Sequence, residues 1–68
     1  MIFDIYKRFE LEIVRVNGRW VVYRLGNGTK RADWTIVVPH ELKEDELVSF
    51  LDDFYHEYAR PGDSITCR

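Results

Sequence analysis

Cysteine is almost absent from this 68-residue chain, and its scarcity limits how the fold can be held together. Cys67 is the only cysteine, so no internal disulfide can form, and a zinc site would need histidine or carboxylate ligands. Small secreted domains are usually held by several disulfides. Because the chain has no recognisable leader segment either, we expect a reducing, cytoplasmic location.

Long apolar runs and a strong net charge are lacking as well. No uninterrupted hydrophobic run approaches the roughly 20 residues that a membrane-spanning helix needs, so we expect no membrane segment. The formal net charge of −2 gives no overall attraction to nucleic acid or to an anionic membrane.

The composition that remains is that of a folded protein. Hydrophobic residues make up 46% of the chain, aromatic residues 15% and charged residues 32%, which disfavours disorder. A chain of this length forms one domain. We place that domain at residues 1–60 and expect residues 61–68 to form a flexible C-terminal tail, with Ser64–Thr66 at most a short edge strand.

The N-terminal region alternates between hydrophobic and polar residues. The hydrophobic residues occupy odd positions, namely Phe3, Ile5, Phe9, Leu11 and Ile13. This period of two predicts a strand with one buried face. A tight two-residue turn at Lys7-Arg8 would pair Ile5 with Glu10 and mix the two faces. We therefore expect one long strand that is bent or bulged near Lys7.

Asn17-Gly18 is the strongest local signal in the chain. Between two β-rich runs it favours a two-residue type I′ turn, in which both central residues take positive φ. Such a turn fixes the register of the hairpin. It places Val14 opposite Val21, Ile13 opposite Val22, Arg15 opposite Trp20, and Glu12 opposite Tyr23.

The middle of the chain predicts a third strand. The second strand ends near Leu25, and Thr29–Asp33 forms either a loop or the ragged arm of a second hairpin. We expect the third strand at Trp34–Val38, ended by Pro39, which cannot donate a ladder hydrogen bond.

The hydrophobic period then changes to that of a helix. Leu47, Leu51, Phe54 and Tyr58 are spaced by four, three and four residues, which predicts an amphipathic helix over 43–59. We expect an α+β fold of β-β-β-α order, an antiparallel three-stranded meander packed against one C-terminal helix. The helix should cover the sheet face that carries Phe3, Ile5, Phe9, Leu11, Ile13, Trp20 and Val22.

The other sheet face carries an apolar group that one helix cannot also cover. It consists of Val14, Val16, Val21, Tyr23 and Leu25, with Glu12 and Arg19 at its rim. Such a patch indicates a binding surface for a protein partner or a second copy in a homodimer. Alternatively, the segment 26–33 or the tail folds over these residues.

Single-stranded nucleic acid is an alternative partner. Residues 1–36 carry seven basic and four acidic side chains, and a basic sheet with exposed rings can stack bases. The phosphate contacts would be Arg15, Arg24, Lys30 and Arg31, and the stacking residues Trp20 and Trp34. The acidic helix and the glutamates on the sheet argue against this alternative, and Arg15 could simply lie over the Trp20 ring.

Nothing in the sequence predicts catalysis, a metal or a cofactor. His40-Glu41 and His56-Glu57 do not form the H-E-x-x-H pattern that places two ligands on one helix face. We expect Asp52 and His56 to pair across one helical turn, or His56 to bind a backbone group near the helix end. Gly18, Gly26 and Gly28 lie in turns between strands, so they make no phosphate-binding loop.

The chain resembles a small bacterial family of uncharacterised cytosolic proteins over about residues 1–60. The resemblance rests on Phe3-Asp4-Ile5-Tyr6, the block Gly18–Gly26, Ile36–Pro39, Leu51-Asp52-Asp53 and His56-Glu57. It implies a short bacterial protein with no assigned activity, and it transfers no catalytic residue.

Overall fold

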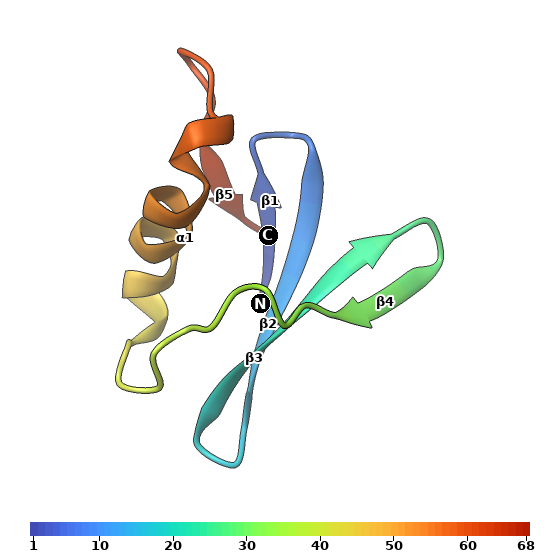
Figure 1. Cartoon of the computed structure of the whole chain (residues 1–68), viewed down its shortest axis with the longest axis vertical. Helices are drawn as coiled ribbons and strands as arrows, with labels where there is room; N and C mark the ends of the chain where they lie inside the picture. Colours follow the sequence, from blue (N-terminus) through green and yellow to red (C-terminus); the bar gives the residue numbers. More distant parts are fainter.

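The structure is a computed structural model that describes all 68 residues. Five antiparallel strands form one sheet in the order β4-β3-β2-β1-β5, and a helical segment packs on one face (Figure 1). The α+β class is therefore confirmed, with five strands in place of three. The strands are β1 (Ile2–Ile5), β2 (Phe9–Val16), β3 (Arg19–Gly26), β4 (Thr29–Ala32) and β5 (Ile65–Cys67).

The prediction of one long N-terminal strand is wrong, because β1 and β2 form a hairpin. A three-residue loop, Tyr6–Arg8, joins them and pairs Ile5 with Phe9 and Phe3 with Leu11. A loop with an odd number of residues keeps the hydrophobic side chains of both strands on one face. A two-residue turn would have mixed them. The loop requires left-handed backbone at Tyr6 (φ 54°) and Lys7 (φ 59°).

The hairpin between β2 and β3 is as predicted. Asn17 and Gly18 have φ values of 50° and 76°, so both central residues take the positive φ of a type I′ turn. All four predicted pairs form, including Val14 with Val21 and Arg15 with Trp20.

The predicted strand at Trp34–Val38 is wrong. The sheet continues instead through Thr29–Ala32, which forms β4 against β3 and so bears out the hairpin-arm alternative. Residues 33–43 cross the helix-side face as irregular chain, burying Ile36 and Val38 and leaving Val37 79% exposed. This alternation imitates a strand, but it arises from packing against the core and not from a ladder.

The helical segment runs from Glu44 to Tyr58. It comprises η1 (Glu44–Glu46), α1 (Leu47–Tyr55) and η2 (His56–Tyr58), in agreement with the predicted 43–59. The Lys43 N–H donates to the Glu46 side chain at 2.9 Å and so caps the start of the segment. The segment lies along one side of the sheet in Figure 1.

The buried stripe of the helix is rotated from the one we expected. Leu47, Leu51 and Tyr55 are buried, whereas Phe54 and Tyr58 are 45% and 58% exposed. Tyr55 takes the core position because its ring packs edge-on against Phe9, with 5.3 Å between the ring centroids.

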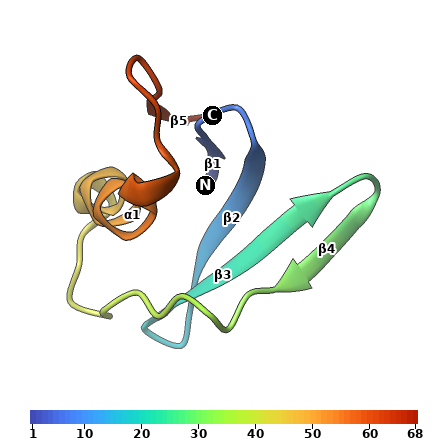
Figure 2. The ribbon, with the colours of Figure 1, turned by 45° about the horizontal axis from the view of Figure 1, so that its top comes forward.

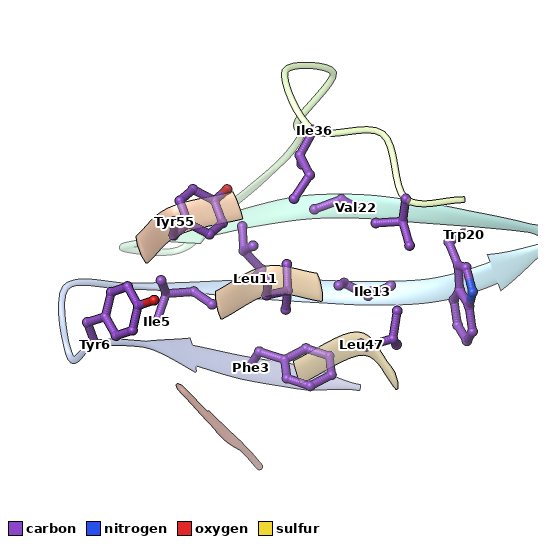
Figure 3. Close-up of a cluster of buried hydrophobic side chains, with 12 residues drawn as sticks. Phe3, Ile5, Tyr6, Leu11, Ile13, Trp20, Val22, Ile36, Leu47 and Tyr55 are labelled. Atoms are coloured by element: carbon purple, nitrogen blue, oxygen red, sulfur yellow. The ribbon is translucent and has the colours of Figure 1, made fainter. Parts of the chain in front are cut away.

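The core lies between the helix and the odd-numbered face of β1 and β2, as predicted. All twelve buried residues are hydrophobic (Figure 3), and Phe9 is partly buried beside them. The buried set is Phe3, Ile5, Tyr6, Leu11, Ile13, Trp20, Val22, Ile36, Val38, Leu47, Leu51 and Tyr55.

Part of the C-terminal segment joins the sheet. Residues Ile65–Cys67 form β5 along the outer edge of β1, with Phe3 opposite Cys67. The Arg68 N–H donates to the Ile2 carbonyl at 2.7 Å. No helix in the chain combines the length and the apolar character that crossing a membrane requires.

Candidate functional site

We call the sheet face opposite the helix the outer face. Its centre consists of Val14, Val16, Val21, Tyr23 and Leu25, and the register brings the pairs Val14–Val21 and Glu12–Tyr23 together as predicted. Val16 is 44% exposed, and the other four side chains are partly exposed.

No second layer covers the outer face. The helix and the segment 33–43 both contribute to the core on the opposite side. The two segments that could have covered the outer face extend the sheet in its own plane. Residues 29–32 form edge strand β4, and residues 65–67 form edge strand β5 (Figure 2).

The rim of the outer face carries ion pairs. The Lys30 ammonium lies 2.7 Å from Oε1 of Glu12 and 4.6 Å from the centroid of the Tyr23 ring. The hydrogen bond from Lys30 lowers the pKa of Glu12, and the same bond raises the pKa of Lys30. Arg68 pairs with Glu10 on the same face. Lys30 therefore belongs to the outer face.

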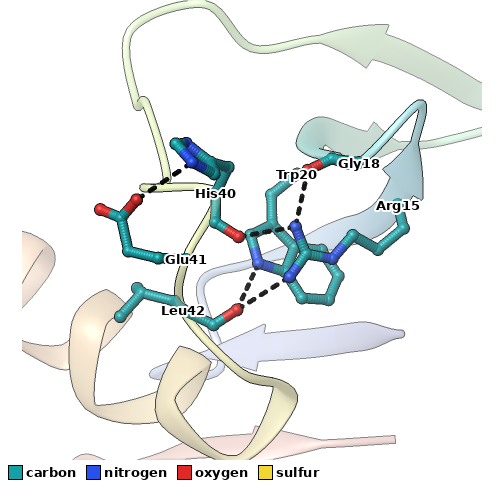
Figure 4. Close-up of polar contacts among 6 residues, drawn as sticks. All are labelled: Arg15, Gly18, Trp20, His40, Glu41 and Leu42. Carbon is teal, nitrogen blue, oxygen red and sulfur yellow. Dashed lines mark hydrogen bonds and ion pairs between the residues drawn. The ribbon is translucent and has the colours of Figure 1, made fainter.

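Arg15 and Trp20 have a structural role. The Arg15 guanidinium lies 3.9 Å from the centroid of the Trp20 ring and donates to the carbonyl oxygens of Gly18, His40 and Leu42 at 2.8–3.0 Å (Figure 4). The indole N–H of Trp20 donates to the same Leu42 oxygen at 2.9 Å, and its side chain is buried. These contacts hold the irregular segment against the sheet, so the pair offers no free platform for nucleic acid.

The other three residues of the predicted nucleic-acid set do come together. Arg24 and Arg31 are partners across β3 and β4, on the helix-side face. With Trp34 they line a hollow of about 630 Å³. The Arg24 guanidinium is held 3.9 Å from the centroid of the Phe9 ring.

A second hollow meets the first at Arg24. It has a volume of about 340 Å³ and is lined by Arg8, Phe9, Arg24 and Tyr58. We call the combined surface the arginine cleft, defined by Arg8, Phe9, Arg24, Arg31, Trp34 and Tyr58. Sequence reasoning missed Arg8 and Tyr58 as parts of a site, because only the three-residue loop and the helix end bring them to β3.

Each histidine contacts a group close to it in the sequence. The predicted Asp52–His56 pair does not form, because Asp52 accepts a hydrogen bond from the Tyr6 hydroxyl at 2.6 Å. Nδ1 of His56 lies 2.9 Å from the Asp53 carbonyl oxygen, which is the backbone contact that we considered as the alternative. His40 lies 3.3 Å from Glu41 at an exposed position. No three His, Cys, Asp or Glu side chains are grouped to hold a metal ion.

Comparison with known proteins identifies a family without assigning an activity. No curated protein and no solved structure matches the chain. A family model described as a domain of unknown function (DUF7661) matches residues 1–67, which include all five strands and the helix. The chain therefore belongs to the DUF7661 family.

Proposed function

We propose that the protein is a non-catalytic cytoplasmic interaction module that self-associates through its outer face. One observation carries this proposal. An entire sheet face with an apolar centre lacks a covering layer, although two segments of the same chain could have provided one. Apolar faces of this kind are typical of interfaces, and soluble oligomers most often pair identical surfaces.

The charges along the outer face favour a second copy as the partner. Arg19 lies at the β2–β3 turn, whereas Asp4 and Glu10 lie opposite each other on β1 and β2 near the other end of the sheet. A two-fold axis perpendicular to the strands would reverse their direction in the second copy. Arg19 of each copy then faces Asp4 of the other, since Glu10 is already paired with Arg68, and Val21 and Tyr23 lie near the axis. Charge matching of this kind fixes orientation more than it adds affinity.

The size of the face predicts a weak dimer. The five strands contain 27 residues, and each covers roughly 3.3 by 4.8 Å of sheet. The face is therefore on the order of 430 Å² in projection, against roughly 800 Å² per partner in a stable interface. We expect dissociation on dilution through the micromolar range.

Light scattering over a wide dilution series tests the proposal. The wild-type mass should approach the 8.2 kDa of one chain at the lowest concentrations and rise well above it at the highest. Val21→Glu places a charge at the centre of the outer face and should remain monomeric throughout. Circular dichroism checks that this variant keeps its helix and sheet.

Val37→Glu is the matched control. Val37 is 79% exposed on the irregular segment, away from the outer face, so the same change in charge should leave association intact. The proposal is wrong if the wild-type chain is monomeric at all concentrations. It is equally wrong if Val21→Glu associates as strongly as Val37→Glu.

A further inference from the structure

We propose that the arginine cleft binds single-stranded nucleic acid. The cleft lies on the helix side of the sheet, so this inference is independent of self-association through the outer face. It also relocates the binding surface from the one that the sequence indicated, since Arg15, Trp20 and Lys30 are engaged elsewhere.

The three arginines of the cleft have no acidic partners. The ion pairs of the structure are Lys30–Glu12, His40–Glu41 and Arg68–Glu10, and none includes Arg8, Arg24 or Arg31. Arg24 and Arg31 also lie directly opposite each other on neighbouring strands, an arrangement that is unfavourable for like charges. A bound anion would relieve this repulsion. Guanidinium groups suit phosphate because their planar fork donates two hydrogen bonds to the phosphate oxygens.

Exposed aromatic rings flank these arginines. Trp34 is 80% exposed and lines the larger hollow, and Tyr58 is 58% exposed and lines the smaller one. An indole ring left in water costs solvation free energy without contributing to the core. Both rings can stack on bases, and such stacking does not depend on sequence.

The shape of the cleft fits an extended chain. The two hollows, about 630 and 340 Å³, share Arg24, so cationic groups follow one another from Arg31 to Arg8. Arg8, Arg24 and Arg31 are all exposed to solvent, and Figure 2 shows the β3–β4 hairpin and the end of the helix on either side of β2. Phe9 supports the middle of the arginine cleft, because the Arg24 guanidinium lies 3.9 Å from the centroid of its ring.

The one carboxylate that lines these hollows is turned to its own loop. Oδ1 of Asp33 accepts hydrogen bonds from both the backbone N–H and the hydroxyl of Thr35. An acidic peptide would satisfy the arginines equally well, but it would leave the faces of Trp34 and Tyr58 unused. The combination of rings and arginines favours a polynucleotide strand.

The experiment measures the fluorescence anisotropy of a labelled oligo-dT of about 12 nucleotides, a length within the range of single-strand sites. At low salt the anisotropy should rise with protein concentration, and the affinity should fall steeply as salt is added. Tryptophan emission gives a second signal. Trp34 is exposed and Trp20 is buried, so quenching by the oligonucleotide should disappear in Trp34→Phe.

Arg31→Glu and Lys43→Glu make a charge-matched pair. Lys43 is exposed at the opposite end of the helix and lines neither hollow. We expect Arg31→Glu to weaken binding by roughly tenfold or more, as loss of a phosphate contact and added repulsion require. Lys43→Glu should stay within about twofold of wild type, since distant exposed charges are screened.

Three results would overturn the inference. One is the absence of any anisotropy change at low salt. Another is equal weakening by Arg31→Glu and Lys43→Glu, which would show attraction by net charge alone. The third is displacement of the oligonucleotide by poly-glutamate as readily as by unlabelled oligo-dT, which would assign the cleft to acidic proteins. Val21→Glu should bind like wild type, so failure of self-association leaves this result unaffected.

Discussion

The Tyr6 hydroxyl donates a 2.6 Å hydrogen bond to Oδ1 of Asp52 and so connects the β1–β2 loop to the helix. The two residues are 46 positions apart. Tyr6 is 4% exposed and has a φ of 54°, a conformation that costs free energy in a residue with a Cβ. The burial of the ring and the bond to Asp52 stabilise the loop in this conformation.

Tyr6→Phe should lower the free energy of unfolding by about 1.5 kcal/mol, since it removes a hydrogen bond to a charged acceptor but keeps the buried ring. Urea denaturation measures the change. Tyr58→Phe is the control, because the Tyr58 side chain is 58% exposed and makes no hydrogen bond within the chain. A loss in Tyr58→Phe equal to that in Tyr6→Phe would contradict the assignment.

Tyr6 also predicts how stability changes at alkaline pH. Burial of the ring, followed by the hydrogen bond to Asp52 and its charge, raises the pKa of Tyr6 from 10.0 to about 12. A group whose pKa is raised by folding contributes stability that is fully present below its unfolded pKa. This contribution is therefore complete below pH 10 and is lost as the pH rises from about 10 to about 12.

The melting temperature, followed across that interval, tests this titration. Wild type should lose stability steeply, and Tyr6→Phe should lose less. Some loss should remain in the variant, because burial raises the pKa of Tyr55 as well. Parallel curves for the two proteins would exclude Tyr6 as the source of the alkaline transition.

Arg15 should matter for stability although it is exposed. Arg15→Ala removes the contact with the Trp20 ring and the hydrogen bonds to the His40 and Leu42 carbonyls, at a cost of about 1–2 kcal/mol. Arg15→Lys should recover only part of this, because an ammonium lacks the fork that reaches both carbonyls.

Thermal unfolding of dilute, monomeric protein measures the effect of Arg15. Arg19→Ala is the control on the same hairpin, since Arg19 is exposed and forms no ion pair. In a Trp34→Phe background Trp20 is the only tryptophan, and its emission should shift to the red when Arg15 is removed. An unshifted spectrum together with unchanged stability would show that the segment 33–43 is held by other contacts.

The sequence predicted those parts of the fold that local chemistry determines. Asn17-Gly18 determined one turn and the register beside it, and the spacing of Leu47 and Leu51 indicated the helix. The Tyr6–Arg8 loop could not be predicted from the sequence. Its left-handed residues, Tyr6 and Lys7, are neither glycine nor asparagine, and the conformation depends on the contact between Tyr6 and Asp52.

The remaining errors have a similar origin. All four residues of β4 are exposed, so the strand has no hydrophobic alternation and is recognisable only through its pairing with β3. Residues 33–43 do alternate, because the core accepts Ile36 and Val38 without a strand partner. The pattern therefore reported burial correctly and secondary structure wrongly.

Of the two surfaces, the outer face could be predicted from the sequence and the arginine cleft could not. Alternation placed Val14, Val21 and Tyr23 on one face, because a face follows from the parity of the register. It could not assemble the arginine cleft. The approach of Arg8 and Tyr58 to Arg24 depends on a loop conformation and on a helix end that no local pattern specifies.

The rotation of the helix gives a last prediction, which compares Leu51→Ala with Phe54→Ala. Leu51 is fully buried, so its truncation should cost about 2–5 kcal/mol. A domain of this size has only about 3–5 kcal/mol in total, so Leu51→Ala should be largely unfolded at room temperature. Phe54 is 45% exposed and contacts Phe50 and Tyr55 at ring-centroid distances of 6.5 and 4.8 Å. Its loss removes aromatic contacts worth about 0.5–1.5 kcal/mol and leaves the fold intact. Circular dichroism at the helix band separates the two results. A larger loss of helix signal in Phe54→Ala than in Leu51→Ala would mean that the helix buries Phe54, as its spacing in the sequence predicted.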